Sequence, residues 1–146
     1  MTPVTRQNLS VAIAQLMPRI IQGVQLEFLV TRTITYTQFL ILVAIHSLKS
    51  CSMGMLAKSM HVSMPTISGI VDRLVTAGYL ARVNNPTDRR QVVVGLSKEG
   101  KKFIAQFQGV VARRWEEVLK HLNQDETESF GRIIQKIAST LQEKEK

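Results

Sequence analysis

Residues 62–96 read VSMPTISGIVDRLVTAGYLARVNNPTDRRQVVVGL, and this stretch decides the fold. Its first half predicts a helix, because Ser63 is a suitable N-cap and Pro65 falls where a missing N–H costs least. Gly78 is placed to end that helix in a left-handed C-cap. Between these signals, apolar residues recur at helical spacing along one side. They are Ile67, Ile70, Val71, Leu74 and Val75.

The opposite side of this helix carries only small or hydrogen-bonding residues, namely Thr66, Ser68, Gly69, Asp72 and Arg73. A helix that only supports a core does not need such an outer face. A helix that enters the major groove of DNA does, because bulky side chains block close approach to base edges. The pattern therefore favours a recognition helix. Its predicted DNA-binding residues are Ser63, Pro65, Thr66, Ser68, Gly69 and Arg73.

The second half of the stretch predicts a β-hairpin. Two β-rich runs, 79–83 and 91–96, flank the turn-forming sequence NNPTD. Arg89 and Arg90 follow the turn, where a guanidinium can reach phosphates or a narrow minor groove. In the alternative interpretation, Asp88 merely pairs with these arginines on a solvated hairpin. Combined with the preceding helix, the hairpin indicates a winged helix-turn-helix with Arg89 and Arg90 as DNA contacts.

At these residues the chain resembles the MarR family of bacterial transcriptional regulators, and the resemblance covers nearly the whole chain. It implies a two-fold dimer that binds DNA, and small phenolic or aromatic carboxylate ligands held between the dimer helices and the winged unit. The sequence departs from the family at Gly69, where members often carry arginine. The matching pieces are Ile34–Phe39, Leu56-Ala57, Val62-Ser63, Val71–Leu74, Gly78–Leu80, Asp88–Arg90 and Leu96-Ser97-x-x-Gly100.

The remaining chain predicts further helices, so the expected fold class is α+β, mainly α. We expect one domain over 1–146, with a winged helix-turn-helix at 34–97 and dimerisation helices at 1–33 and 98–146. The wide apolar stripes of the flanking helices favour a homodimer, the alternative being a monomer that folds them back on its own core. The expected segments are a helix over about 7–30 distorted at Pro18, a helix starting at Thr35 or Thr37, a loop at 49–52, a helix at 53–60, a helix from Ser97 to about Leu122, and a last helix opened by a capping box of Asn123 and Glu126.

The amino-acid composition indicates which classes of molecule the protein can bind. A net charge of +8 and a pI of about 10.1 favour a polyanion, and 5% aromatic residues argue against a stacking platform for single-stranded nucleic acid. One cysteine excludes an internal disulfide, which fits the reducing cytoplasm. No apolar run is long enough to span a membrane, so no membrane partner is expected.

Several other motifs are considered and set aside. Residues 95–102 nearly match a phosphate-binding loop, but Lys102 stands where Ser or Thr must hold magnesium. His46, His61 and His121 have no i, i+4 partner, so no metal is expected. Cys51 lacks a resolving cysteine, which favours an ordinary loop cysteine over a redox sensor. We expect neither catalysis nor a cofactor.

A small-molecule site is a stronger candidate. Arg19 could hold a carboxylate in a bidentate contact while Tyr36 packs against an aromatic ring. Alternatively, Arg19 is a surface charge and Tyr36 a packing residue. The sequence thus predicts a regulator, acting as a repressor, that binds a pseudo-palindromic operator in double-stranded DNA and is released by a small aromatic or anionic effector. Alternatives are a non-specific architectural DNA-binding protein and a winged-helix protein-interaction module.

Overall fold

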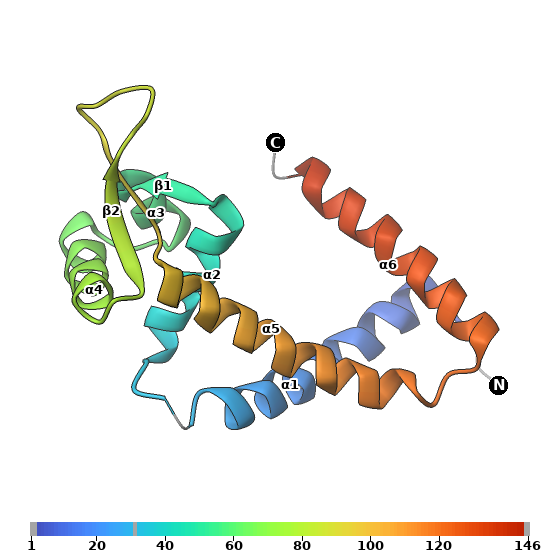
Figure 1. Cartoon of the computed structure of the whole chain (residues 1–146). Helices are drawn as coiled ribbons and strands as arrows, with labels where there is room; N and C mark the ends of the chain where they lie inside the picture. The colour runs from blue at the N-terminus through green and yellow to red at the C-terminus, as the bar shows by residue number, and fades with distance from the viewer. Residues whose placement is uncertain (1–2, 31, 145–146) are drawn as a thin grey trace. The chain divides into compact units, whose positions relative to one another are not determined.

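The computed structural model describes residues 3–30 and 32–144 (Figure 1). The chain divides into two compact units, Met1–Val110 and Val111–Lys146, and the division falls inside helix α5 (Lys98–Leu119). The predicted winged helix-turn-helix lies wholly within the first unit. The prediction of a single domain over 1–146 stays a prediction.

Two helices open the first unit, and local capping sets where each begins. Helix α1 (Arg6–Phe28) starts at Thr5, whose side chain accepts a hydrogen bond from the N–H of Asn8. It continues through Pro18, which cannot donate to the carbonyl four residues earlier. Helix α2 (Tyr36–Leu48) begins with a capping box between Thr35 and Gln38. Of the two predicted starts of this helix, Thr35 is therefore the correct one.

The sheet has three antiparallel strands in the order β1-β3-β2. Strands β2 (Leu80–Asn84) and β3 (Val92–Leu96) form the predicted hairpin to within one residue. The prediction of a loop over 49–52 is wrong, because 50–52 form strand β1, which pairs with β3. Three residues are too short to show a strand periodicity, and their partner lies more than forty residues further along the chain.

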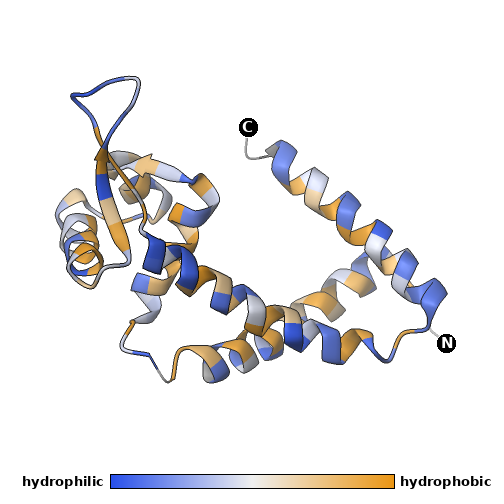
Figure 2. Ribbon diagram, viewed as in Figure 1, coloured by the Kyte–Doolittle hydropathy of each residue, from blue (hydrophilic) through white to orange (hydrophobic). Residues whose placement is uncertain are grey.

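Helices α3 (Met53–Ser59) and α4 (Met64–Thr76) pack with α2 and the sheet in this unit. The core that holds them is apolar, and none of the described residues adds a buried polar or charged side chain to it. Figure 2 shows the loop of the hairpin as hydrophilic and strand β2 as mainly hydrophobic with a hydrophilic band. The side chains with the lowest exposure include Phe28, Ile41, Leu42, Ile45, Leu56, Ile67, Val71, Leu74 and Val94.

The last two helices also begin as predicted. Ser97 accepts the N–H of Gly100 at the start of α5. Asn123 and Glu126 exchange both hydrogen bonds of a capping box at the start of α6 (Gln124–Lys144). Within the second unit, the rings of Trp115 and Phe130 lie 6.2 Å apart between centroids. No helix among the described residues combines the length and apolarity that crossing a membrane requires.

Two helices leave apolar side chains uncovered, α1 in the first unit and α6 in the second. Such rows are unusual on an isolated chain and mark surfaces that bind another partner. The side chains are more than 40% exposed in each case. They are Leu9, Val11, Ile13, Leu16, Met17 and Ile21 on α1, and Ile133, Ile134, Ile137 and Leu141 on α6.

Candidate nucleic-acid interface

Helix α4 is fixed at both ends by the signals that the sequence predicts. At its start, Ser63 Oγ accepts the N–H of Thr66 at 3.3 Å, and Pro65 occupies the first turn. At its end, Gly78 has φ +87°. The N–H of Tyr79 donates to the carbonyl of Leu74, and that of Gly78 to the carbonyl of Val75. This pair of bonds is the Schellman motif, which requires a left-handed residue at the position of Gly78.

The two sides of α4 differ as predicted. Ile67, Val71 and Leu74 are buried, at 0%, 0% and 1% exposure. On the other side, most of the predicted DNA-binding residues are exposed, and only Ser68 is half-buried. The hydroxyls of Ser63 and Thr66 also bond to each other at 2.8 Å, which orients both at the N-terminal turn. The exposed residues of this set are Ser63, Pro65, Thr66, Gly69 and Arg73.

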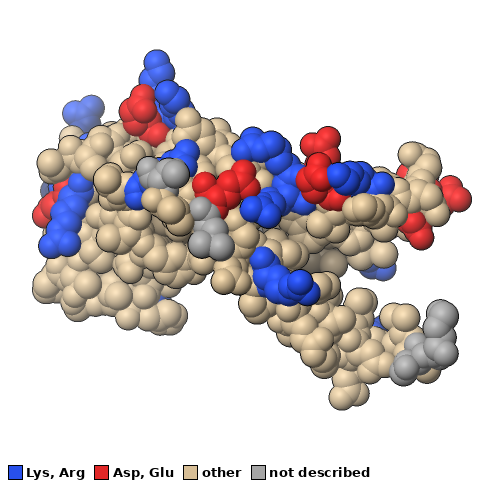
Figure 3. Space-filling view, turned by 90° about the horizontal axis from the view of Figure 1, so that it is seen from below, with Lys and Arg blue, Asp and Glu red and all other residues tan. Residues whose placement is uncertain are grey.

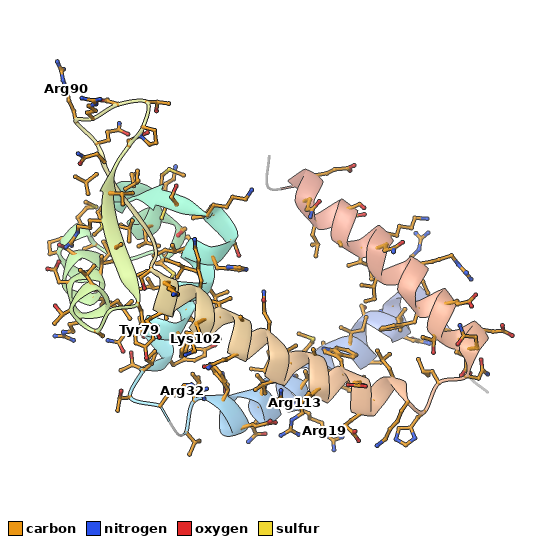
Figure 4. The ribbon with its side chains drawn as sticks, in the orientation of Figure 1. Arg19, Arg32, Tyr79, Arg90, Lys102 and Arg113 are labelled. Carbon is orange, nitrogen blue, oxygen red and sulfur yellow. The ribbon has the colours of Figure 1, made fainter. Side chains whose placement is uncertain are left out.

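The loop of the hairpin, residues 85–91, presents its two arginines to solvent. Asp88 Oδ1 accepts the backbone N–H of Arg90 at 3.0 Å, and Asn85 Oδ1 accepts that of Thr87. Among residues 3–30 and 32–144, no hydrogen bond or ion pair is present to the guanidinium groups of Arg89 and Arg90. Figure 4 shows Arg90 at the far end of this loop. Asp88 therefore shapes the turn rather than neutralising the arginines.

An ion pair that the sequence did not predict ties α4 to the hairpin. The guanidinium of Arg82, on β2, pairs with the carboxylate of Asp72, on the exposed side of α4. Both side chains remain partly exposed, at 36% and 58%. No sequence signal marks this pair, because it depends on how a strand crosses a helix ten residues away. The pair neutralises the one acidic residue on the exposed side of α4.

Ser97 and Gly100 both shape the junction between β3 and α5. The backbone N–H of Ser97 donates to the carbonyl of Tyr79 at 3.0 Å, and its hydroxyl donates to the carbonyl of Gly78. A Cβ at Gly100 would overlap the carbonyl oxygen of Tyr79. Figure 4 places Tyr79 beside the first turn of α5, near Lys102. The stretch 95–102 therefore joins the end of α4 to the hairpin and to α5.

The predicted ligand residues are only partly brought together. An open groove in the first unit is lined by Tyr36 but not by Arg19, which is exposed on α1 (Figure 4). The sequence did not single out Arg32, which lies near this region. The guanidinium carbon of Arg32 lies 3.8 Å from the ring centroid of Phe28. One guanidinium N–H of Arg32 donates a hydrogen bond to the Phe28 carbonyl at 2.6 Å. The groove residues are Gln22, Gln25, Leu29, Val30, Ile34 and Tyr36.

The cysteine and the histidines occupy ordinary positions. Cys51 lies in β1 at 2% exposure, and burial raises the pKa of its thiol. Burial thus disfavours the thiolate that oxidant sensing requires. His46 contacts the amide of Gln108 at 3.3 Å, whereas His61 adopts φ +54° in the turn between α3 and α4. The described part of the chain contains no group of three or more His, Cys, Asp or Glu side chains able to hold a metal ion.

Charge does not mark the interface by itself. On the face drawn in Figure 3, lysine and arginine side chains lie at several places, and acidic side chains adjoin some of them. The candidate interface is defined instead by the capped helix, its small exposed side and the hairpin arginines. This arrangement of three helices and a three-stranded sheet is that of winged helix-turn-helix DNA-binding proteins.

Comparison with known proteins refines this class. The model of the MarR family matches residues 34–92. The multiple antibiotic resistance protein MarR of Escherichia coli (strain K12) is 30% identical over 112 residues, which cover 76% of this chain and 78% of that protein. The chain belongs to the MarR family of DNA-binding transcriptional regulators.

Solved structures agree with the fold. The transcriptional regulator Tm0710 from Thermotoga maritima superposes with a TM-score of 0.79 at 21% identity, covering 95% of this chain and 97% of that one. A mutant of E. coli MarR in complex with operator DNA has a TM-score of 0.55 at 26% identity, covering 92% and 99%. The first of these likenesses concerns the fold alone.

Proposed function

We propose that the protein is a sequence-specific repressor that binds a two-fold symmetric operator as a homodimer. One observation carries the proposal: α4 is capped at both ends, exposed along its small polar side, and accompanied by a hairpin loop whose guanidinium groups have no hydrogen bond or ion pair among residues 3–30 and 32–144. Exposed hydroxyls suit base edges, and the helix N-terminus and exposed guanidinium groups suit phosphates. The operator complex of the related E. coli protein supports this assignment.

The uncovered apolar rows on α1 and α6 support the proposed homodimer. A second copy of the chain offers the same rows, so a two-fold axis can cover them with no further partner. Two recognition helices held in this way read half-sites about one helical turn apart, roughly 10 base pairs from centre to centre. A repressor acts by occupying such a site, and its release then controls transcription.

A small effector that binds the groove beside Tyr36 completes the proposal. The tyrosine ring offers stacking, and the amides of Gln22 and Gln25 offer hydrogen bonds. A ligand that fits the groove better when the recognition helices are differently spaced would release the DNA. Arg19, outside this lining, remains our proposed partner for a ligand carboxylate. Titration of the DNA complex with benzoate, repeated for Tyr36→Ala and Arg19→Ala, measures each contribution to release.

The decisive experiment is selection of bound sequences from random duplex DNA at 150 mM salt, a condition under which non-specific binding is weak. We expect enrichment of one motif with two-fold symmetry. Binding without enrichment would instead support a non-specific architectural protein. Failure to bind any duplex would favour a winged-helix module that recognises another protein.

A further inference from the structure

Gly69 lies in the middle of the exposed side of α4, and nothing in the surrounding chain requires a glycine there. A Cβ at this position would meet no atom within 4 Å, and its φ is not in the left-handed region. At Gly78 and Gly100, by contrast, the fold does require glycine. Gly78 has φ +87°, and a Cβ added at Gly100 would overlap the carbonyl oxygen of Tyr79. Glycine inside a helix is less stable than alanine, so the fold alone favours alanine at position 69.

Gly69 leaves a gap between the side chains on the exposed side of α4, because it has no side chain and open space surrounds it. Pro65 and Arg73 lie one turn before and after it on the same side of α4, whereas the buried residues point the other way. The backbone N–H and C=O groups in the interior of a helix are bonded to each other. At the Cα of Gly69 this gap therefore offers van der Waals contact but no hydrogen bond, whereas the polar side chains of Thr66 and Asp72 lie three residues before and after it.

We propose that Gly69 is the point of closest approach between α4 and DNA, and that the gap left by its missing side chain receives the 5-methyl group of a thymine. The thymine methyl is the apolar group that a base pair presents in the major groove. A purine edge or the amino group of cytosine would place an unpaired donor or acceptor against Cα, which is unfavourable, and the C5–H of cytosine would leave the gap unfilled. The inference rests on the proposed function, and it assigns to Gly69 a specificity that depends on having no side chain.

The first test separates fold from recognition with two alanine variants. Gly131 is the matched control, because it is exposed within α6 and a Cβ there also meets nothing within 4 Å. Both Gly69→Ala and Gly131→Ala should raise the melting temperature, by about 2–4 °C. Only Gly69→Ala should weaken binding to the selected operator, by about tenfold. Gly69→Leu should weaken it further, because the added side chain is larger.

The second test changes the DNA. Each thymine of the selected operator is replaced in turn by deoxyuridine, which lacks only the methyl group. For the wild type, one position per half-site should lose affinity, by about threefold to tenfold. At that position, deoxyuridine should improve binding of Gly69→Ala, since the protein methyl then takes the place of the DNA methyl.

Three results are distinguishable. Equal or tighter operator binding by Gly69→Ala would overturn the assignment, as would the same response of both proteins to every deoxyuridine. A wild type that binds without sequence preference would overturn the proposed function and this inference together. If the wild type prefers one sequence, and Gly69→Ala responds differently from the wild type to deoxyuridine at one position, the result supports both the proposed function and this inference.

Discussion

The recognition helix α4 and the hairpin loop at residues 85–91 are both exposed and polar, but the protein holds them in different ways. The helix has a cap at each end, a buried apolar side and an ion pair from Asp72 to β2. The loop is shaped by short-range bonds such as that from the Arg90 N–H to Asp88. A fixed element can discriminate between bases, whereas long side chains on a loop can follow phosphates without a fixed geometry.

This difference predicts that α4 determines sequence preference and that the loop contributes affinity independent of sequence. Both roles need two copies of the chain, because one copy has a single recognition helix. The substitutions below separate these contributions.

The largest effect should come from Ile134→Glu, outside both regions. Ile134 is 46% exposed in the apolar row of α6, so an added carboxylate would be buried unpaired in the dimer, at a cost of about 3–5 kcal/mol. We expect a folded monomer and a loss of operator affinity of at least about a hundredfold. Light scattering and DNA titration on one preparation measure both, and Gln135→Glu is the control for added charge. If the Ile134→Glu variant is a folded monomer that still binds the full operator tightly, the protein does not need to be a dimer to recognise its operator.

Next in size, Gly100→Ala should damage the joint that holds α4 and the hairpin together. The added Cβ would overlap the carbonyl oxygen of Tyr79, which already accepts the Ser97 N–H. We expect destabilisation by about 2–4 kcal/mol, seen as a lower urea midpoint. Gly131→Ala, where space is free, should not lower the midpoint. Equal midpoints for Gly100→Ala and the wild type would show that the helix can shift away from Tyr79 at little cost.

Thr66→Ala should change which base is preferred at one or two operator positions, by about 1–3 kcal/mol each. The N-cap survives, because Ser63 accepts a backbone N–H that alanine retains. A repeat of the duplex selection with the variant measures the preference. Uniformly weaker binding with the same preferred sequence would place Thr66 on the DNA backbone instead.

Arg90→Ala should weaken operator and random DNA by similar factors. Loss of one phosphate contact lowers the slope of log K against log salt by about 0.9. Titrations at several salt concentrations measure this slope, and Arg90→Lys, which keeps the charge, should retain most of it. If the alanine variant binds as the wild type does at moderate salt, the hairpin does not contact DNA.

The elements that the sequence predicted best are those with local signals. Ser63, Pro65 and Gly78 delimit α4. The capping pairs Thr35–Gln38 and Asn123–Glu126 start two other helices. The start of each of these helices can therefore be predicted from a few neighbouring residues. Strand β1 was missed because hydrogen bonds to β3 create it.

The same distinction applies to the candidate interface. The exposed residues of α4 and the hairpin arginines follow from periodicity and turn chemistry. The Arg82–Asp72 pair requires the three-dimensional packing, since a separation of ten residues is characteristic of neither a helix nor a hairpin. Arg32 and Phe28 are four residues apart, but α1 ends at Phe28, so a helical contact between them did not follow from the spacing. The sequence analysis predicted a ligand site at Tyr36. It did not predict that Gln22 and Gln25 line the groove, because no motif distinguishes them from the other residues of α1.

The smallest expected effect on stability concerns the link between the two regions. Arg82→Met removes the partner of Asp72, and because both side chains are partly exposed the loss should be at most about 1 kcal/mol. DNA affinity should fall by a larger factor, because Asp72 would then present an unpaired negative charge on the side of α4 that we propose faces the negatively charged DNA. Urea unfolding and DNA titration measure the two effects separately.

The double variant Asp72→Asn with Arg82→Met identifies the cause. If the uncompensated carboxylate weakens binding, removing it should restore most of the affinity that Arg82→Met loses, whereas Asp72→Asn alone should change affinity little. If Arg82 instead contacts DNA itself, the double variant stays as weak as the single one. In that case the hairpin would read DNA along β2 as well as through its loop, and the division of roles between helix and hairpin would be less sharp than their packing suggests.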